Sequence, residues 1–254
     1  MSQISTQISL CSNMDIKLLI YYLAIAVGGV LSAIVGYSLG KKRELPPKPL
    51  KMFLFLALFF GFFGAFLMGQ LQNFVMSLTG LSYNISRMRI FGGLLFMPLF
   101  LYFPVKYLGG DFKLISDIFA PGTFLLLGCS KIGCAVYGCC YGIPWEHGVP
   151  SPFENHLCFP VQALESLLCF ALFGVMYILY TKKRLKKGTA YPTGLILYGV
   201  VRFLVEFLRY YPEEQRTYFL GINFWQLVSV LTVIIGITWL IITKYGKAAR
   251  KTQK

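Results

Sequence analysis

The sequence predicts an all-α, polytopic membrane protein of about seven transmembrane helices, with the N-terminus outside and the C-terminus in the cytoplasm. Of its 254 residues, 56% are hydrophobic and only 13% are Asp, Glu, Lys or Arg, whereas soluble domains carry roughly 25% charged residues. Several apolar runs exceed the roughly 18 residues that indicate a transmembrane helix. The basic residues recur at regular places between these runs. We expect residues 1–254 to form a single transmembrane domain.

The apolar runs define seven spans, each long enough to cross a hydrocarbon core of about 30 Å at about 1.5 Å per residue. The expected spans are 18–40, 52–78, 90–108, 114–137, 159–180, 190–208 and 219–242. Pro98 and Pro104 are expected to kink the third span. No basic segment precedes the first span, so we expect a retained helix and not a cleaved signal peptide.

The positions of the basic residues predict the orientation and explain the net charge of +14. Seventeen of the 24 basic residues follow odd-numbered spans. They are Lys41, Lys42, Arg43, Lys48, Lys51, Lys106, Lys113, Lys182, Lys183, Arg184, Lys186, Lys187, Lys244, Lys247, Arg250, Lys251 and Lys254. Basic residues gather on the cytoplasmic side of membrane proteins, so the odd-numbered spans are expected to end there. This distribution argues against nucleic acid as a partner.

The remaining basic residues lie inside spans or toward the outer face, where the topology rule does not place them. They are Lys17, Arg87, Arg89, Lys131, Arg202, Arg209 and Arg216. An ionised group at mid-bilayer costs between about 2.5 and more than 10 kcal/mol. Each such residue therefore needs a partner or a function.

The sixth span contains charges at helical spacing. Arg202, Glu206 and Arg209 are separated by four and three residues, and Tyr198 lies one turn earlier, so a helix would place all four on one face. One acid between two arginines leaves surplus positive charge, which suits an anionic lipid phosphate. The other interpretation is an ion pair that holds helices together.

Further candidates lie in the fourth and fifth spans and at the start of the third. Glycines 128, 133, 138 and 142 would admit close approach of backbone or of a lipid head group. Lys131 among them either extends to an interface or faces a ligand. Glu165 is expected to pair with a buried cation, Arg202 or Lys131. The segment RMRIFGG (87–93) combines two arginines with two glycines, for an interfacial contact or an entrance.

The seven cysteines do not form a recognisable framework. They are Cys11, Cys129, Cys134, Cys139, Cys140, Cys158 and Cys169. No compact CxxC pair is present, so neither a metal nor another cofactor is expected, and small buried packing residues are the favoured interpretation. A disulfide from Cys158 to Cys139 or Cys140 and a catalytic thiol remain alternatives.

Four stretches carry a family resemblance: DIFAP, GCSKIGCAVYGCCYG, FPVQALE and YPTGLILYGVVRFLVEFLR. Over residues 87–240 their order and spacing resemble the prolipoprotein diacylglyceryl transferases of bacterial inner membranes. The resemblance implies a seven-helix fold in the cytoplasmic (inner) membrane. It also implies transfer of a diacylglyceryl group from phosphatidylglycerol to a lipoprotein cysteine, with release of glycerol phosphate.

The resemblance also implies roles for individual residues. It makes Arg202, Glu206, Arg209 and Lys131 the expected catalytic residues. The expected substrate-binding residues are Gly92, Gly93, Cys134, Gly138, Gly142, Glu165 and Tyr198.

The sequence departs from the family pattern at several of these positions. Lys131 stands where Arg is usual, Cys134 where Asn is usual, and Phe159 where another His is common. The usual His-Gly-Gly, whose histidine has been proposed as a base, is Phe91-Gly92-Gly93 here. Two alternatives therefore stay open beside the lipoprotein transferase. One is a phospholipid-using enzyme with another peptide or a small-molecule acceptor, and the other is a lipid-binding or transport protein without chemistry.

Overall fold

A computed structural model describes residues 2–78, 89–150, 156–211, 218–219 and 222–252, and this part of the chain folds into helices with two short hairpins. The helices are α1 (Ser2–Lys41), α2 (Pro47–Leu78), α3 (Ile90–Tyr107), α4 (Phe112–Tyr137), α5 (Val161–Thr181), α6 (Ala190–Glu206) and α7 (Phe224–Thr252). Each predicted span corresponds to one of them, so the all-α class is confirmed. Both prolines of the third span lie inside a continuous helix.

Five of the helices have spans long and apolar enough to cross a membrane: Ile16–Lys41, Pro47–Val75, Phe112–Tyr137, Val161–Thr181 and Phe224–Lys244. Helix α3 is apolar but shorter, and α6 has only 17 residues, Arg202 and Glu206 among them. The chain is therefore a multi-pass membrane protein. A total of seven crossings and the predicted orientation stay predictions.

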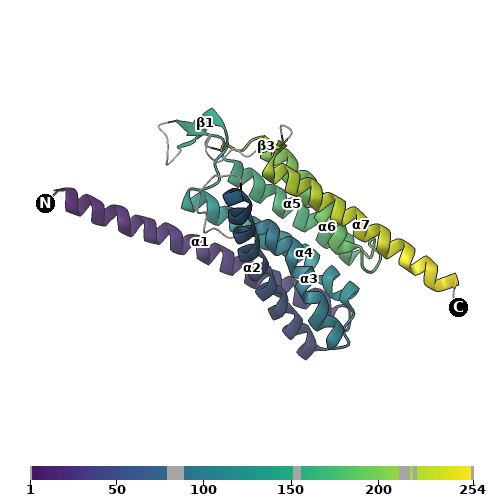
Figure 1. The fold of residues 1–254 in the computed structure, drawn as a ribbon. Helices are drawn as coiled ribbons and strands as arrows, with labels where there is room; N and C mark the ends of the chain where they lie inside the picture. Colours follow the sequence, from purple (N-terminus) through teal and green to yellow (C-terminus); the bar gives the residue numbers. More distant parts are fainter. Residues whose placement is uncertain (1, 79–88, 151–155, 212–217, 220–221, 253–254) are drawn as a thin grey trace.

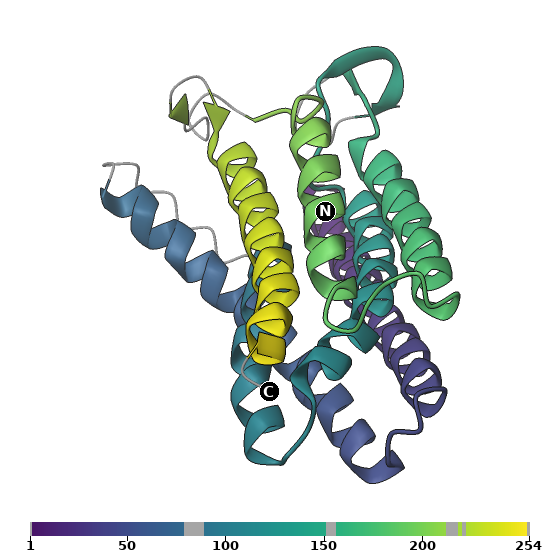
Figure 2. The same cartoon turned by 90° about the vertical axis from the view of Figure 1, so that its right-hand side faces the viewer.

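Helix α4 lies at the centre of the bundle. Its apolar window is 72% buried, against 17% for that of α1. Helices α5, α6 and α7 run side by side, and α1 extends away from the bundle toward the N-terminus (Figure 1). The turned view shows α4 beside α5 and α6 (Figure 2). A side chain carried by α4 is thus well placed to meet side chains from α5 and α6.

Two hairpins that the sequence analysis did not predict lie at one end of the bundle (Figures 1 and 2). Strand β1 (Pro144–Pro150) pairs with β2 (Leu157–Cys158), and β3 (Tyr218–Phe219) pairs with β4 (Ile222–Asn223), both antiparallel. They join α4 to α5 and α6 to α7, respectively. If the predicted orientation holds, this is the outer end.

The outer surface of the helices is apolar, as lipid contact requires. Phe55, Leu167 and Ile242 each expose more than 60% of their surface, which a water-soluble protein would normally avoid in a continuous patch. Inside, α2 and α3 approach closely: a Cβ built on Gly92 would lie 2.0 Å from the carbonyl oxygen of Gly64. Small residues permit such helix contacts in lipid.

The start of α6 is fixed by a buried carboxylate on α4. Asp117 is only 2% exposed, and it accepts hydrogen bonds from the backbone N–H groups of Gly188 (2.5 Å), Ala190 (2.8 Å) and Tyr191 (3.3 Å). The first N–H groups of a helix have no partner within the helix. A carboxylate there accepts their hydrogen bonds, and its negative charge interacts favourably with the positive end of the helix dipole. This contact sets where α6 begins and hence where Arg202 lies.

Candidate active site at the junction of α4, α5 and α6

Five charged side chains meet where α4, α5 and α6 pack together, and we call them the charge cluster. Lys131 comes from α4, Glu165 from α5, Arg202 and Glu206 from α6, and Arg209 from the turn that follows. No side chain of the cluster exposes more than 7% of its surface. Charges so buried are retained only with partners or for a function.

Glu165 is the centre of the cluster. Its Oε1 lies 3.0 Å from Lys131 Nζ and 3.6 Å from Arg202 Nε. Its Oε2 accepts a hydrogen bond of 2.6 Å from Arg209 Nη2. The predicted pairing of Glu165 with a buried cation is confirmed, and Lys131 pairs with this acid instead of extending to an interface.

The second acid, Glu206, lies between the two arginines as the spacing predicted. Its Oε2 is 2.5 Å from Arg202 Nη1 and 3.8 Å from Arg209 Nε, and the Tyr211 hydroxyl donates to its Oε1. Three cations therefore face two carboxylates, and the charge cluster carries one surplus positive charge.

Arg209 reaches the cluster by another route than the helical spacing suggested. Helix α6 ends at Glu206, two residues short of the predicted end. Arg209 forms an isolated β-bridge with Gly142, and the Ile143 N–H donates to the Leu208 carbonyl at 3.0 Å. The loop after α4 thus holds the loop after α6, and this pairing places the Arg209 guanidinium on Glu165.

Four buried polar atoms of the cluster have unused hydrogen-bonding capacity. Glu165 Oε1, Arg202 Nη1, Glu206 Oε2 and Arg209 Nε make no hydrogen bond of regular geometry to any described residue. All four lie within ion-pair distance of an opposite charge. Arg202 Nη1 is already 2.5 Å from Glu206 Oε2, whereas Arg209 Nε is 3.8 Å from it, so Arg209 Nε is the donor of the two that an oxyanion entering the cluster would use.

Aromatic rings cover one side of the cluster. Phe91 is 3% exposed, stacks on Trp225 with ring centroids 5.9 Å apart, and lies 5.6 Å from the ring of Tyr198. The Arg202 guanidinium lies over Phe91 (5.9 Å), and the Arg89 guanidinium lies over Trp225 (5.1 Å). Each is a cation–π contact. Arg87, the other arginine of that segment, lies outside the described residues.

The candidate glycines have structural roles in this fold. A Cβ on Gly93 would lie 2.8 Å from the Gly61 carbonyl oxygen, so Gly92 and Gly93 both serve the contact of α2 with α3. Gly138 ends α4 with φ +83°, and a Cβ on Gly142 would lie 2.5 Å from the Phe159 carbonyl oxygen. Their part in binding substrate stays a prediction.

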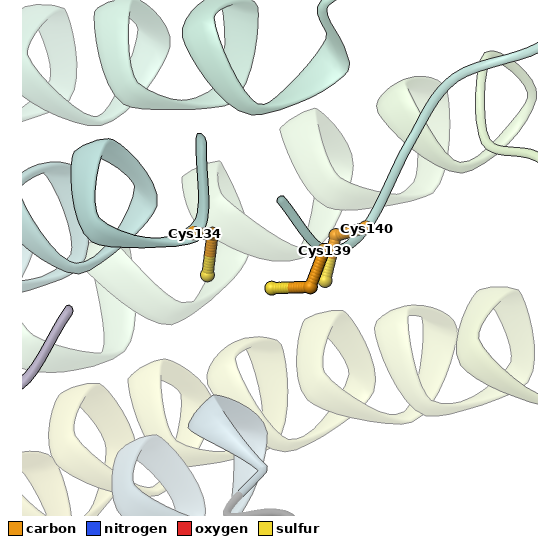
Figure 3. A group of neighbouring side chains, drawn as sticks. All are labelled: Cys134, Cys139 and Cys140. Carbon is orange, nitrogen blue, oxygen red and sulfur yellow. The ribbon is translucent and has the colours of Figure 1, made fainter. Parts of the chain in front are cut away.

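Three thiols that the sequence spacing left apart come together beside the charge cluster. The sulfur atoms of Cys134, Cys139 and Cys140 all lie within 4.8 Å of one another. Figure 3 shows the three side chains gathered at the end of α4. The turn at Gly138 closes the longer spacing, so the missing CxxC motif does not keep these thiols apart. Cys158 is buried with a free thiol, and the structure does not form the considered disulfide from it to Cys139 or Cys140.

Three groups outside the membrane-spanning segments have pKa values shifted by burial or by hydrogen bonds with their neighbours. Thiol hydrogen bonds from Cys134 and Cys139 hold the pKa of Cys140 well below its usual value, against the effect of burial. Burial raises the pKa of the Tyr211 hydroxyl. On the other side of the bundle, burial opposes ionisation of Asp111, but hydrogen bonds from Lys187 and the Leu114 N–H outweigh it and lower the pKa of Asp111.

Some residues of the site were missed by the sequence analysis. Tyr211 binds Glu206, and Gln162 Nε2 donates to the Cys139 carbonyl at 2.7 Å. Gln162 lies three residues before Glu165, nearly one helical turn, which was a usable signal. Tyr211 follows the end of α6 in a loop, where no periodicity reports which way a side chain points.

Comparison with known proteins gives one consistent family. A family model described as prolipoprotein diacylglyceryl transferase matches residues 9–242. The phosphatidylglycerol–prolipoprotein diacylglyceryl transferase of Clostridium tetani is 31% identical over 62% of this chain and 65% of its own length. Transferase 2 of Clostridium perfringens is 32% identical over 48% of this chain and 49% of its own length. Transferase 1 of the same organism is 28% identical over 91% of this chain and 93% of its own length.

In the matches to the Clostridium tetani protein and to transferase 2, the chain spans between about half and just under two thirds of the relative's length. The family model, in contrast, covers the charge cluster, the three thiols and every helix at least in part. The chain therefore belongs to the prolipoprotein diacylglyceryl transferase family.

Proposed function

We propose that this chain transfers a diacylglyceryl group from phosphatidylglycerol to the cysteine thiol of a prolipoprotein in the bacterial cytoplasmic (inner) membrane. The curated relatives carry the names of that activity. Residues 87–240 form the catalytic core of this proposal, and the loops beyond α4 and α6 face outward, where the acceptor would arrive.

The observation that carries the proposal is the surplus positive charge of a fully buried cluster. Arg202 and Arg209 each keep a nitrogen without a regular hydrogen bond, and both guanidinium groups lie against Glu165 of the neighbouring helix α5. A phospholipid phosphate would satisfy these donors and the excess charge at once. A merely structural ion-pair network would be expected to balance its charges.

The proposed reaction needs stabilisation of a leaving phosphate. The acceptor thiolate attacks a glyceryl carbon, and a C–S bond forms. The bond between that carbon and the ester oxygen of the phosphate breaks, and its electron pair stays on the oxygen. The thiol proton goes to solvent, and glycerol phosphate leaves with one more negative charge than the diester carried. Arg202, Arg209 and Lys131 stabilise that charge, and Glu165 and Glu206 hold the cations in place.

The remaining candidates have supporting roles in the proposal. Tyr198 packs against Phe91 and Phe124 beneath Arg202, and Gly142 admits the backbone pairing that places Arg209. Gly138 and Cys134 shape the loop on the acceptor side, while Gly92 and Gly93 bring α3 close. The relatives' names favour a prolipoprotein acceptor over a small molecule and over a non-catalytic lipid carrier.

The test is transfer from labelled phosphatidylglycerol to a cysteine-bearing lipobox peptide by the full chain in liposomes. We expect Arg202→Ala to lower kcat about 10²- to 10³-fold, as loss of one donor to a developing oxyanion does. Arg184→Ala is the matched control, because Arg184 is an exposed arginine in the loop between α5 and α6. Full activity of Arg202→Ala would sink the proposed phosphate site.

A further inference from the structure

The three-thiol cluster beside the charge cluster has the chemistry and the geometry of a metal site. Sulfur ligands select soft or borderline ions such as zinc. With Zn–S bonds of about 2.3 Å, sulfurs at the corners of a tetrahedron would lie about 3.8 Å apart. The sulfur atoms of Cys134, Cys139 and Cys140 lie within 4.8 Å of one another, so closure on an ion needs a contraction of about 1 Å or less.

The backbone holds these thiols together at some cost. Helix α4 ends with Gly138 in the left-handed region, and the Cys139 N–H turns back to the Cys134 carbonyl at 3.1 Å. Cys140 also has a positive φ of 64°. A non-glycine residue in that region costs about 1–3 kcal/mol and persists where its surroundings enforce it, most often at functional sites.

The thiols are tied to the charge cluster by three separate contacts. Cys134 lies one helical turn after Lys131 on α4. The Cys139 carbonyl accepts from Gln162, which precedes Glu165 on α5. Gly142, two residues after Cys140, forms the β-bridge with Arg209. A group bound at the thiols would therefore lie next to the cations assigned to the donor phosphate.

We infer that Cys134, Cys139 and Cys140 bind a zinc ion whose fourth position takes the acceptor thiol. This inference rests on the proposed function. Three protein ligands with one open position are typical of catalytic zinc, and two of the three residues, Cys139 and Cys140, are only half-buried.

Zinc would supply the deprotonation of the acceptor thiol that the histidine expected from the family resemblance, replaced here by Phe91, would otherwise provide. A thiol that coordinates zinc loses its proton, which passes to solvent, and the sulfur stays a thiolate at neutral pH. Zinc keeps its oxidation state throughout.

The first experiment measures metal on the full chain purified in detergent under reducing conditions. After chelation and reloading with ZnCl₂, we expect one zinc per chain by elemental analysis. Bound zinc should protect Cys134, Cys139 and Cys140 from alkylation and leave the reaction of Cys129 unchanged. Cys139→Ser should lose the metal, and Cys129→Ser, also on α4 but outside the three thiols, should keep it. Alkylation of the unaltered chain gives a result even if Cys139→Ser fails to fold.

The second experiment asks whether the fourth position takes a thiol. Co²⁺ in place of zinc should give thiolate charge-transfer absorption, and a lipobox peptide with cysteine should shift it while the serine peptide does not. The metal site would be overturned by any of three results: zinc bound at less than one ion per chain, binding of Cu⁺ but not of zinc, or equal alkylation with and without zinc. A spectrum indifferent to the cysteine peptide would overturn the acceptor position. Zinc binding with no transfer from phosphatidylglycerol would instead refute the proposed function.

Discussion

Replacement of Glu165 by glutamine tests the arrangement of the charge cluster most directly. The residue is 0% exposed and contacts Lys131, Arg202 and Arg209 through its two oxygens. Glutamine keeps the size of the side chain but removes its charge, so the net charge of the cluster rises from +1 to +2. Removing one partner of a buried ion pair costs about 3–5 kcal/mol, because the remaining charges stay desolvated.

The expected loss is large enough to measure by thermal unfolding in detergent. For a chain of this size each kcal/mol shifts the melting temperature by about 2–4 °C, so Glu165→Gln should melt roughly 6–20 °C lower than the unaltered protein. Glu146→Gln is the control, since Glu146 is an exposed acid on β1, and it should shift the melting temperature by little.

Added phospholipid separates an anion site from a purely structural network. Phosphatidylglycerol brings a negative charge, so it should restore more of the melting temperature of Glu165→Gln than phosphatidylethanolamine does. An unchanged melting temperature in Glu165→Gln would refute the central role of this carboxylate. Equal rescue by both lipids would show that the cluster does not select a lipid of net negative charge, and rescue by neither lipid would refute the cluster as a phosphate site.

Three further predictions concern the scaffold. Gly92→Ala should lower the free energy of unfolding by about 1–3 kcal/mol, because the added methyl group overpacks α2 against α3. A Cβ on Gly61 meets nothing within 4 Å, so Gly61→Ala should be neutral or stabilising by up to about 1 kcal/mol. Chemical denaturation of the two variants measures this difference. Asp111→Asn keeps the cap of α4 but loses the ion pair with Lys187, at a cost of about 0.2–1 kcal/mol near neutral pH. Because the folded-state pKa of Asp111 is lowered, the difference in melting temperature between this variant and the unaltered protein should vanish as the pH falls below about 4. Asp117→Ala should cost about 2 kcal/mol or more by leaving N–H groups of α6 without acceptors, and Asp117→Asn should recover part of it; unfolding midpoints that are equal for both would contradict the capping role.

The helices and the charge pairs were predictable because both rest on local rules. Apolar runs of sufficient length define spans whatever their neighbours are, and spacings of three and four residues place side chains on one face. The pairing of Arg202 with Glu206 followed from that spacing. The pairing of Glu165 with a buried cation was predictable because an unpaired charge in an apolar span is energetically costly.

The parts that could not be predicted depend on loops and on tertiary pairing. Arg209 is placed by a β-bridge to Gly142, a residue 67 positions away, and helical spacing merely coincided with the result. The gathering of Cys134 with Cys139 depends on one residue, Gly138, in the left-handed region. A single sequence shows the glycine but not the hand of the turn.

The stack of Arg202, Phe91, Trp225 and Arg89 has a consequence for how reaction rate should vary with acidity. A histidine in place of Phe91 would add a group that changes protonation near neutral pH. The charge cluster contains lysine, arginine and glutamate but no histidine. A slope of the rate near neutral pH should therefore report the ionisation of sulfur, at the acceptor thiol and at the three thiols beside the cluster.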